Sequence, residues 1–307
     1  MSHPSQPIGI AIIGLSGYAT DVVAYQQAIS RLHAMGHAVH DYTAPEKKFQ
    51  RFADSDEGRL EQLLAAVNNP EVELIIALRG GYGLSRLLPQ IDFASLAASK
   101  KLFVGHSDFT ALQMGLLAQT GAVSFAGPMI CDDFSRANVS EFTHTHFWQC
   151  LHNQSITIQS SYKGNPTLDV QGTLWGGNLS MLVSLIGTPW MPNVEGGILF
   201  IEDVNEHPYR VERMLLQLAH AGILQKQKAV LFGDFSAYKL SEYDNGYNFD
   251  SMLAFVRQHV SVPMLQGLQF GHTLDKLTLP VGAKAYLQSD ANGFSLAISN
   301  YPYLAVA

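Results

Sequence analysis

Short apolar runs alternate with helical patterns along the first half of the chain. The segment IGIAIIGL (8–15) is almost continuously apolar, which is typical of a strand covered on both faces of its sheet. Further apolar segments of strand length lie at 38–42, 72–78 and 101–105. Helical stretches separate them, among them GRLEQLLAAVN (58–68). Strands that alternate with helices at such intervals predict a layered α/β domain with a parallel sheet.

The pattern becomes less regular after Pro128, and residues 153–167 are polar and rich in turn formers. We place the domain boundary there, which predicts an N-terminal α/β domain at 1–160 and a C-terminal domain at 168–307. The second half mixes both patterns, with strands expected at 196–203, 228–235 and 263–271 and helices at about 178–186, 208–222 and 249–260. This mixture predicts an α+β domain.

Composition and charge exclude several classes of protein. The 307 residues are 47% hydrophobic and 15% charged, which supports two real cores and argues against a long disordered arm. Lys and Arg number 19 against 26 Asp and Glu, and a net charge of −7 argues against nucleic acid and anionic membranes as partners. No tract reaches the roughly 18–20 apolar residues of a membrane helix.

Two features indicate a cytoplasmic protein. The segment MSHPSQPIGIAIIG lacks the charged and apolar regions of a signal peptide. The two cysteines, Cys131 and Cys150, lie outside any CxxC pair, so we expect reduced, structural thiols.

The segment FVGHSDFTAL (103–112) places polar residues at the corner between a buried strand and a helix. Ser107 there is either a helix cap, whose oxygen accepts a hydrogen bond from a free amide, or a nucleophile held at an elbow. Gly105 and the strand–turn–helix context favour the elbow, where the helix N-terminus supplies amides for an oxyanion. Phe109 stands where the Gly-x-Ser-x-Gly motif has its second glycine, so the local pattern leaves both interpretations open.

A second corner, RGGYG (79–83), directly follows the apolar strand ELIIAL. Consecutive glycines at the carboxyl end of a buried strand let backbone amides approach a ligand closely, although a plain strand-to-helix turn has the same sequence. If the two corners lie side by side, the amide of Gly81 is a second oxyanion donor.

A serine nucleophile needs a base and a group that orients the base. Glu202 ends the apolar strand GGILFI, and His272 follows the strand LQGLQFG. Titratable side chains at the ends of core strands are more often functional than those on surface helices. For each residue alone, a solvated strand end remains the alternative.

Two other groups of titratable residues have plainer interpretations. Glu206 and His207 precede Pro208 at a helix start, where helix capping is the better interpretation. His144 and His146 lie two residues apart, unlike the i, i+4 spacing of HExxH, and no further ligands join them, so we expect no metal site.

Two glycine-containing segments remain. In GTLWGGNLSML (172–182), Asn178 is a helix cap and Trp175 a core residue, or else the stretch forms one wall of a binding cleft. IIGLSGYA (12–19) resembles half of a dinucleotide-binding fingerprint, but Ile12 occupies the place of its first glycine. Asp41 also lies 27 residues beyond Gly14, further than the usual spacing of roughly 20.

Taken together, the motifs resemble those of the LD-carboxypeptidases, also named muramoyltetrapeptide carboxypeptidases. The similarity rests on five ordered segments, namely RGGYGLSRLLPQIDF, GHSDFTALQ, GTLWGGNLSMLVSLIGTPWMP, FIEDVNEHPYRVERMLLQL and GLQFGHTLDKLTLPVGA. It extends from SGYA near the start to about residue 285 and is greatest to the enterobacterial type of cytoplasmic enzyme. It implies an N-terminal domain like that of class I glutamine amidotransferases, a smaller β-rich C-terminal domain, and an active site at their junction.

The resemblance also implies roles for individual residues. The chain would be a serine peptidase with Ser107 as nucleophile, His272 as base and Glu202 as the acid that orients the base. The amides of Gly81 and Asp108 would form the oxyanion hole. The family more often has Tyr at the position of His106. Substrate contacts are expected from Arg79, Gly80, Trp175 and Asn178, with Arg86 and Arg210 as further cationic candidates.

The implied reaction belongs to peptidoglycan recycling. It releases the terminal D-Ala of the murein tetrapeptide from the L-centre of meso-diaminopimelate, in the cytoplasm, by a homodimer that uses no metal or cofactor. Microcin-immunity peptidases share the scaffold, so a microcin-type peptidyl nucleotide is an alternative substrate. A catalytically silent muropeptide-binding module is an alternative of another class, against which the presence of all three triad residues argues.

Overall fold

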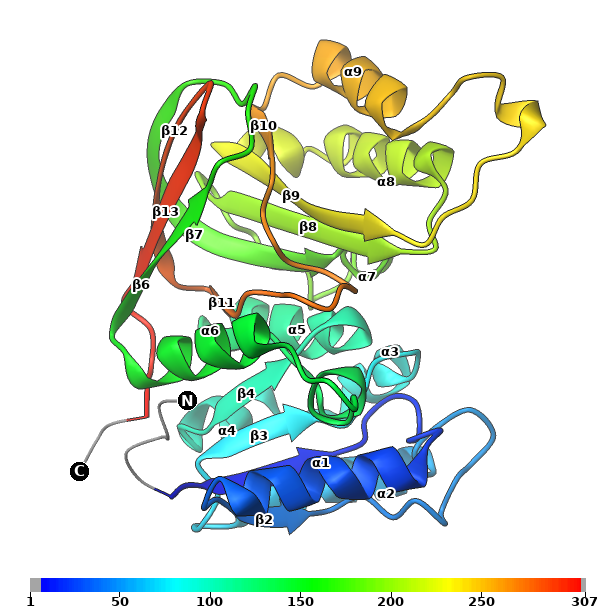
Figure 1. Ribbon diagram of the computed structural model, residues 1–307, viewed down its shortest axis with the longest axis vertical. Coiled ribbons are helices and arrows are strands. Elements are labelled where there is room, and N and C mark those ends of the chain that lie inside the picture. Colours follow the sequence, from blue (N-terminus) through cyan, green and yellow to red (C-terminus); the bar gives the residue numbers. More distant parts are fainter. Residues whose placement is uncertain (1–6, 305–307) are drawn as a thin grey trace.

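Residues 7–304, the part of the chain that the computed structural model describes, form two sheets with helices packed around them. The first six residues of the segment interpreted above as lacking a signal peptide therefore lie outside the described range. Figure 1 shows the sheets one above the other, and we call each sheet with its helices the lower and the upper lobe. No helix in the described range has both the length and the hydropathy of a membrane span.

The lower sheet has the strand order β11-β5-β4-β3-β1-β2. Its central strands are buried along their whole length, as the apolar runs predict. Five strands are parallel, namely β1 (Gly9–Ile13), β2 (Ala38–Asp41), β3 (Leu74–Ala77), β4 (Leu102–Gly105) and β5 (Ser124–Ala126), and β11 (Leu279–Val281) is antiparallel to β5. The predicted parallel α/β arrangement is confirmed.

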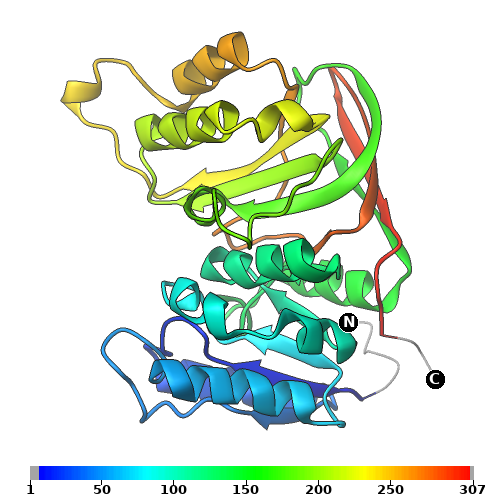
Figure 2. The same ribbon diagram turned by 180° about the vertical axis from the view of Figure 1, so that it is seen from behind.

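Helices cover both faces of the lower sheet. On the face seen in Figure 1 lie α1 (Val22–Ala34) and α6 (Glu141–His152). On the opposite face, seen in Figure 2, lie α2 (Asp56–Asn68) and α4 (Phe93–Ala98). The buried helix α5 (Thr110–Thr120) lies between this sheet and the upper lobe, where it contacts the strand at 168–178 and the helix that follows it.

The upper sheet has the strand order β10-β9-β8-β7-β12-β13-β6. Its parallel half consists of β7 (Leu168–Asn178), β8 (Ile198–Val204), β9 (Ala229–Ser236) and β10 (Met264–Gln266). Its antiparallel half continues from β7 through β12 (Lys284–Asp290) and β13 (Gly293–Ser299) to β6 (Ser155–Ser160). The helices of this lobe are α7 (Leu179–Ser184), α8 (Pro208–His220) and α9 (Phe249–His259).

Each sheet takes one strand from the other side of the predicted domain boundary. Strand β6, within residues 1–160, pairs with β13 in the upper sheet. Strand β11, within residues 168–307, pairs with β5 in the lower sheet. The two lobes are therefore joined by main-chain hydrogen bonds as well as by side-chain packing.

The strand predicted at 263–271 is the main correction to the expected elements. The regular strand ends at Gln266, because Gly267 adopts φ +97° and turns the chain. The segment still follows β9, since the amide of Asp234 donates to the carbonyl of Phe270 at 2.8 Å. The segment after β10 thereby places His272 at the boundary between the lobes.

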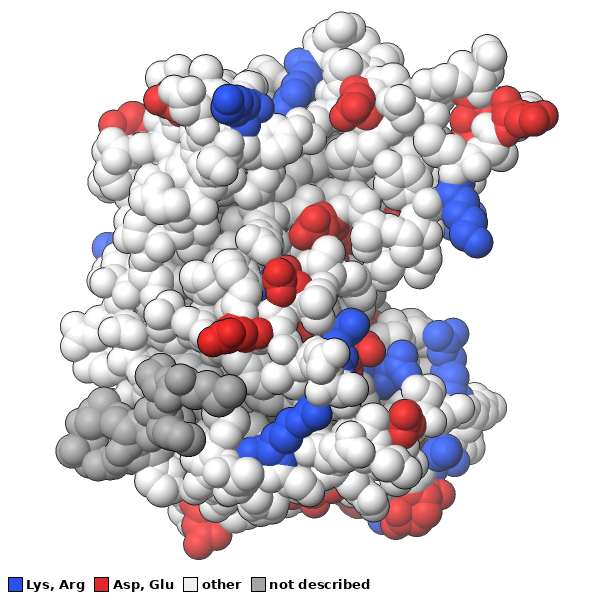
Figure 3. Space-filling view, in the orientation of Figure 1, with Lys and Arg blue, Asp and Glu red and all other residues white. Residues whose placement is uncertain are grey.

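The parallel strands of both lobes point the same way. The carboxyl ends of β3 and β4 below, and of β8 and β9 above, lie on the same side in Figure 1. On this side the space-filling view shows a notch between the lobes, with blue basic groups along its lower rim (Figure 3). Ligand sites of α/β proteins lie at the carboxyl ends of such strands.

Candidate active site

Ser107 lies at the sharp corner that links β4 to α5. Its backbone adopts φ +61°, the left-handed region that a residue with a side chain rarely enters. Such strain costs about 1–3 kcal/mol and persists where the surroundings impose it. The residue before the short helical turn 107–109 is His106, and no side-chain cap is made there. The corner therefore has the geometry of an elbow, and Ser107 is not its helix cap.

The RGGYG loop lies directly against Ser107. A β-carbon placed on Gly80 would come within 2.7 Å of the Ser107 Oγ and 3.6 Å of the Asp108 amide nitrogen. Any side chain at position 80 would thus collide with the hydroxyl. The sequence-based expectation that the two corners lie side by side is correct.

The side chain of Asp108 ties three loops together. Its Oδ2 accepts hydrogen bonds from Ser16 Oγ at 2.5 Å and from the Leu84 amide at 2.9 Å. Burial raises the pKa of Asp108, and the bond from Ser16 opposes that rise. The IIGLSG segment, which resembled a dinucleotide-binding motif, therefore supplies a hydroxyl that anchors the serine loop.

Glu202 and His272 form a hydrogen-bonded pair. The Nδ1–H of His272 donates to Glu202 Oε2 at 2.7 Å, which leaves Nε2 free to act as a base. Glu202 is 0% exposed, and its other oxygen accepts from Asn178 Nδ2 at 3.1 Å. Burial alone lowers the pKa of His272, but the hydrogen bond and charge of Glu202 outweigh it, so the pKa is raised above the ordinary 6.5.

His106 brings the serine corner and the histidine together. Its ring packs edge-on against His272 with centroids 5.0 Å apart. Its Nδ1–H donates to the Gly127 carbonyl at 2.8 Å, and burial, followed by the charge of Lys276, holds its pKa well below the ordinary value. In the described range no hydrogen bond joins Ser107 Oγ to His272, but His106, the residue before Ser107, packs against the His272 ring.

The GTLWGGNLSML segment hydrogen-bonds Glu202 through Asn178 and packs against α5. Asn178 caps α7, as one interpretation had it, and its side-chain amide donates to both Glu202 and Asp203. Its backbone amide donates to Thr110 Oγ1 at 3.1 Å, and a β-carbon on Gly177 would lie 2.6 Å from that oxygen. The glycine therefore permits the upper sheet to dock closely on α5.

Trp175 departs from the expected substrate contact. Its ring is 0% exposed, and its indole N–H donates to Gln227 Oε1 at 2.9 Å. The alternative interpretation, an ordinary core residue, describes it better. Asn178 likewise donates its side-chain amide hydrogens to the carboxylates of Glu202 and Asp203. In this structure its side chain therefore contacts the catalytic acid.

Other candidates lie where the simpler interpretations put them. His207 caps α8 by accepting from the Tyr209 amide, and Asp41 accepts from the Thr43 amide and hydroxyl in a local turn. His144 bonds the Asp133 carbonyl, and among residues 7–304 no three His, Cys, Asp or Glu side chains cluster as metal ligands. Both thiols are free, and burial raises the pKa of Cys131 to about 12.

The cationic candidates differ in position. Arg79 lies beside the serine corner, with Nη1 donating to the Tyr18 carbonyl at 3.3 Å. Arg86 pairs with Asp56 at 2.8 Å, and Arg210 pairs with Glu206 at 3.7 Å on the surface of the upper lobe. Of these three candidates, Arg79 is the one on the loop that lies against Ser107.

Sequence reasoning missed a buried ion pair near the site. Lys276 Nζ contacts Asp133 Oδ1, and both side chains are almost completely buried. Lys276 follows His272 by four residues, and Asp133 lies in the helical segment 130–134 of the lower lobe. A lone Lys in DKLTLP carries no sequence signal of its burial, because its partner is 143 residues away.

Two family descriptions match most of the chain. The LD-carboxypeptidase N-terminal domain matches residues 10–127, and the LD-carboxypeptidase C-terminal domain matches residues 171–287. A probable murein peptide carboxypeptidase of Bacillus subtilis is 32% identical over 240 residues, which cover 77% of this chain and 75% of the relative. The microcin C7 self-immunity protein MccF of Escherichia coli is 28% identical over 273 residues, 78% of this chain and 77% of that protein.

A solved structure is more similar still. The muramoyltetrapeptide carboxypeptidase from Oxalobacter formigenes is 54% identical, with a TM-score of 0.92, and the match covers 96% of this chain and 99% of that one. The chain belongs to the LD-carboxypeptidase family.

Proposed function

We propose that the chain is a serine carboxypeptidase that releases the terminal D-Ala from the murein tetrapeptide, at the bond after the L-centre of meso-diaminopimelate. The observation that carries the proposal is the Glu202–His272 pair, 2.7 Å apart, beside a serine held at φ +61°. The similarity to enzymes named for murein peptides supports the choice of substrate.

The mechanism follows from the roles of the three side chains. Nε2 of neutral His272 takes the proton of Ser107 as its oxygen attacks the scissile carbonyl carbon. The same proton then passes to the amine of the departing D-Ala. Glu202 keeps the imidazole in the tautomer with Nδ1–H and stabilises the imidazolium. Water, activated by His272, then hydrolyses the ester on Ser107.

The oxyanion of the tetrahedral intermediate needs fixed donors. We assign them to the amides of Gly81 and Asp108, which flank Ser107 on two loops. Asp108 is held rigidly through Ser16 and Leu84, and rigid donors cost no reorganisation during the reaction. Arg79 and Gly80 complete the proposed wall around the scissile bond.

Further parts of the proposal rest on the family resemblance. They are a homodimer, a cytoplasmic location, the division into domains at 1–160 and 168–307, and a glutamine amidotransferase-like N-terminal domain. Sedimentation at micromolar concentration tests the dimer directly, because a monomer of 33.6 kDa would contradict it.

Mass spectrometry of L-Ala-γ-D-Glu-meso-diaminopimelate-D-Ala incubated with the protein tests the reaction. We expect tripeptide and free D-Ala, and no reaction when L-Ala replaces the terminal residue. The similarity to MccF makes a microcin-type peptidyl nucleotide the second substrate to try. Cleavage of that compound alone would contradict the murein assignment, and binding of unchanged tetrapeptide would indicate a silent binding module.

The pH dependence of kcat/KM tests the role of the Glu202–His272 pair. Since only neutral His272 accepts the serine proton and its pKa is raised, we expect activity to fall on acidification with a midpoint above 6.5. In Glu202→Gln the charge is lost and burial dominates, so the midpoint should move to lower pH. Glu206→Gln, which removes a carboxylate paired with Arg210, is the control and should leave it in place. An unchanged midpoint in Glu202→Gln would remove Glu202 from this role.

A further inference from the structure

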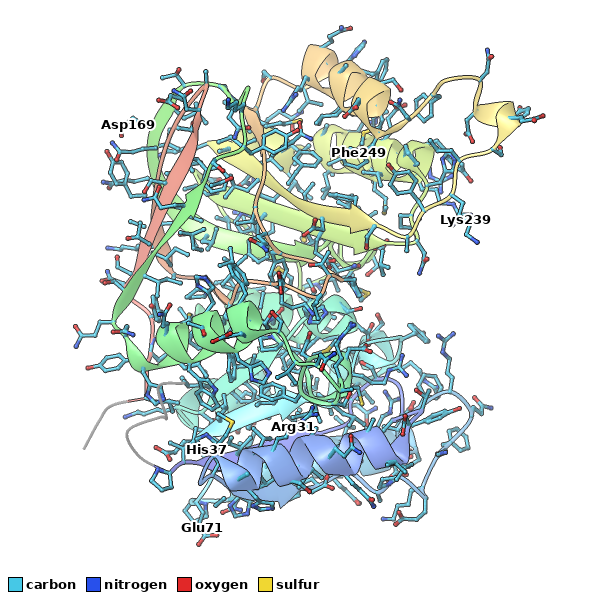
Figure 4. The ribbon with its side chains drawn as sticks, viewed as in Figure 1. Arg31, His37, Glu71, Asp169, Lys239 and Phe249 are labelled. Atoms are coloured by element: carbon cyan, nitrogen blue, oxygen red, sulfur yellow. The ribbon has the colours of Figure 1, made fainter. Side chains whose placement is uncertain are left out.

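A cavity opens in the upper lobe, and Asp234 is among its lining residues. It has a volume of about 510 Å³ and lies between the end of β9, the segment after β10 and the start of α9. Its aromatic walls include Phe235, Tyr238 and Phe249. In Figure 4, Phe249 lies in the upper lobe beside the start of α9. The mechanism above makes no use of this cavity.

Asp234 connects the cavity with the catalytic pair. It lines the cavity and follows Gly233 on β9, opposite Glu202 on β8, where Ile201 pairs with Phe232 and Asp203 with Phe235. A β-carbon on Gly271, the residue before His272, would lie 3.0 Å from the Asp234 β-carbon. The register of β8 against β9 shifts at Glu202, and Asp234 lies close enough to Glu202 for their charges to interact.

Asp234 has no cationic partner among residues 7–304. It belongs to none of the ion pairs in residues 7–304, and no Lys, Arg or His in that range lines the cavity. Burial, and then the charge of Glu202, raises the pKa of Asp234, whereas Thr273 beside it acts in the opposite direction. A half-buried carboxylate next to a second carboxylate is stabilised by a cation.

The surroundings define what kind of cation fits. The face seen in Figure 3 carries red acidic groups at mid-height, and blue basic groups lie both below the notch and on its upper side. Aromatic faces beside a carboxylate accept an ammonium on an aliphatic stem, through cation–π attraction and apolar contact. A free carboxylate would be repelled by Asp234.

We propose that Asp234 binds the side-chain ammonium of the substrate residue whose carbonyl is attacked, and that this cavity selects peptides carrying such a group. The inference rests on the proposed function. In meso-diaminopimelate the second centre, with its ammonium, lies about 5 Å along an aliphatic arm from the centre that holds the scissile carbonyl. We place that arm between the Ser107–His272 junction and β9, since Asp234 lies against Gly271, the residue before His272.

The test compares three tetrapeptides that differ at the third residue: diaminopimelate, lysine and norleucine. Lysine keeps the ammonium without the second carboxylate, and norleucine has neither. We expect the wild type to favour lysine over norleucine by about 10- to 100-fold in kcat/KM, as for a hydrogen bond to a charged group. In Asp234→Asn the lysine-to-norleucine ratio should fall toward one, chiefly through KM.

Asp290→Asn is the matched variant, because Asp290 is an exposed carboxylate at the end of β12 and does not line this cavity. This control variant should retain the wild-type lysine-to-norleucine ratio of kcat/KM. If the control lost that ratio and Asp234→Asn kept it, the assignment to Asp234 would be overturned. An equal loss of kcat on all three peptides in Asp234→Asn would also overturn it, since that pattern reports an effect on Glu202 and His272. Failure of the wild type on every peptide would instead contradict the proposed function.

Discussion

Ser107→Ala lowers kcat for D-Ala release by on the order of 10⁴-fold or more, with little change in KM. The substitution removes the attacking oxygen and leaves the loops around it in place, since Asp108 rather than Ser107 makes the anchoring hydrogen bonds. Alanine and serine both carry a β-carbon, so the substitution adds no backbone strain at φ +61°. His272→Ala should lose a similar factor, and the double variant should lose little more than either single one, because the two act as a unit.

The measurement is steady-state kinetics on the tetrapeptide, accompanied by labelling with a fluorophosphonate. Wild type should label and Ser107→Ala should not. Ser184→Ala is the matched control, because Ser184 is an exposed serine on α7 that bonds the carbonyl of Met181. Near-normal turnover of Ser107→Ala would exclude Ser107 as the nucleophile.

Lys276→Met destabilises the folded protein by about 3–5 kcal/mol, the cost of leaving one partner of a buried ion pair without the other. Asp133 keeps a hydrogen bond from the Met129 amide at 2.8 Å, but its charge then faces an apolar interior. The backbone amide of Lys276 donates to Thr143 Oγ1, a bond to the lower lobe that the substitution leaves in place.

Urea denaturation measures this loss as a lower midpoint at an unchanged slope. Lys226→Met is the control, because Lys226 pairs with Glu195 at the surface and its removal should cost no more than about 1 kcal/mol. The double variant Lys276→Met/Asp133→Leu should recover part of the loss, since apolar pairs often replace buried ion pairs without penalty. A loss below about 1 kcal/mol in Lys276→Met would contradict a buried charged pair.

The local elements follow from the sequence because their causes are local. The apolar runs of β1, β3 and β4 and the glycines around Ser107 and in RGGYG fix a strand–corner–helix path through neighbouring residues alone. The five ordered motifs likewise identify the family without coordinates.

Only the tertiary structure decided how distant residues combine. Glu202 and His272 are 70 residues apart, and their contact depends on the path of β8, β9 and the segment after β10. The burial of Trp175, the Lys276–Asp133 pair and the cavity beside Asp234 likewise arise from packing between segments. Hydrophobic periodicity reports which face of an element is buried, but it carries no information about which partner lies there. The sequence by itself therefore determined the family, the parallel α/β core and the serine corner, and tertiary packing decided which charges meet around that corner.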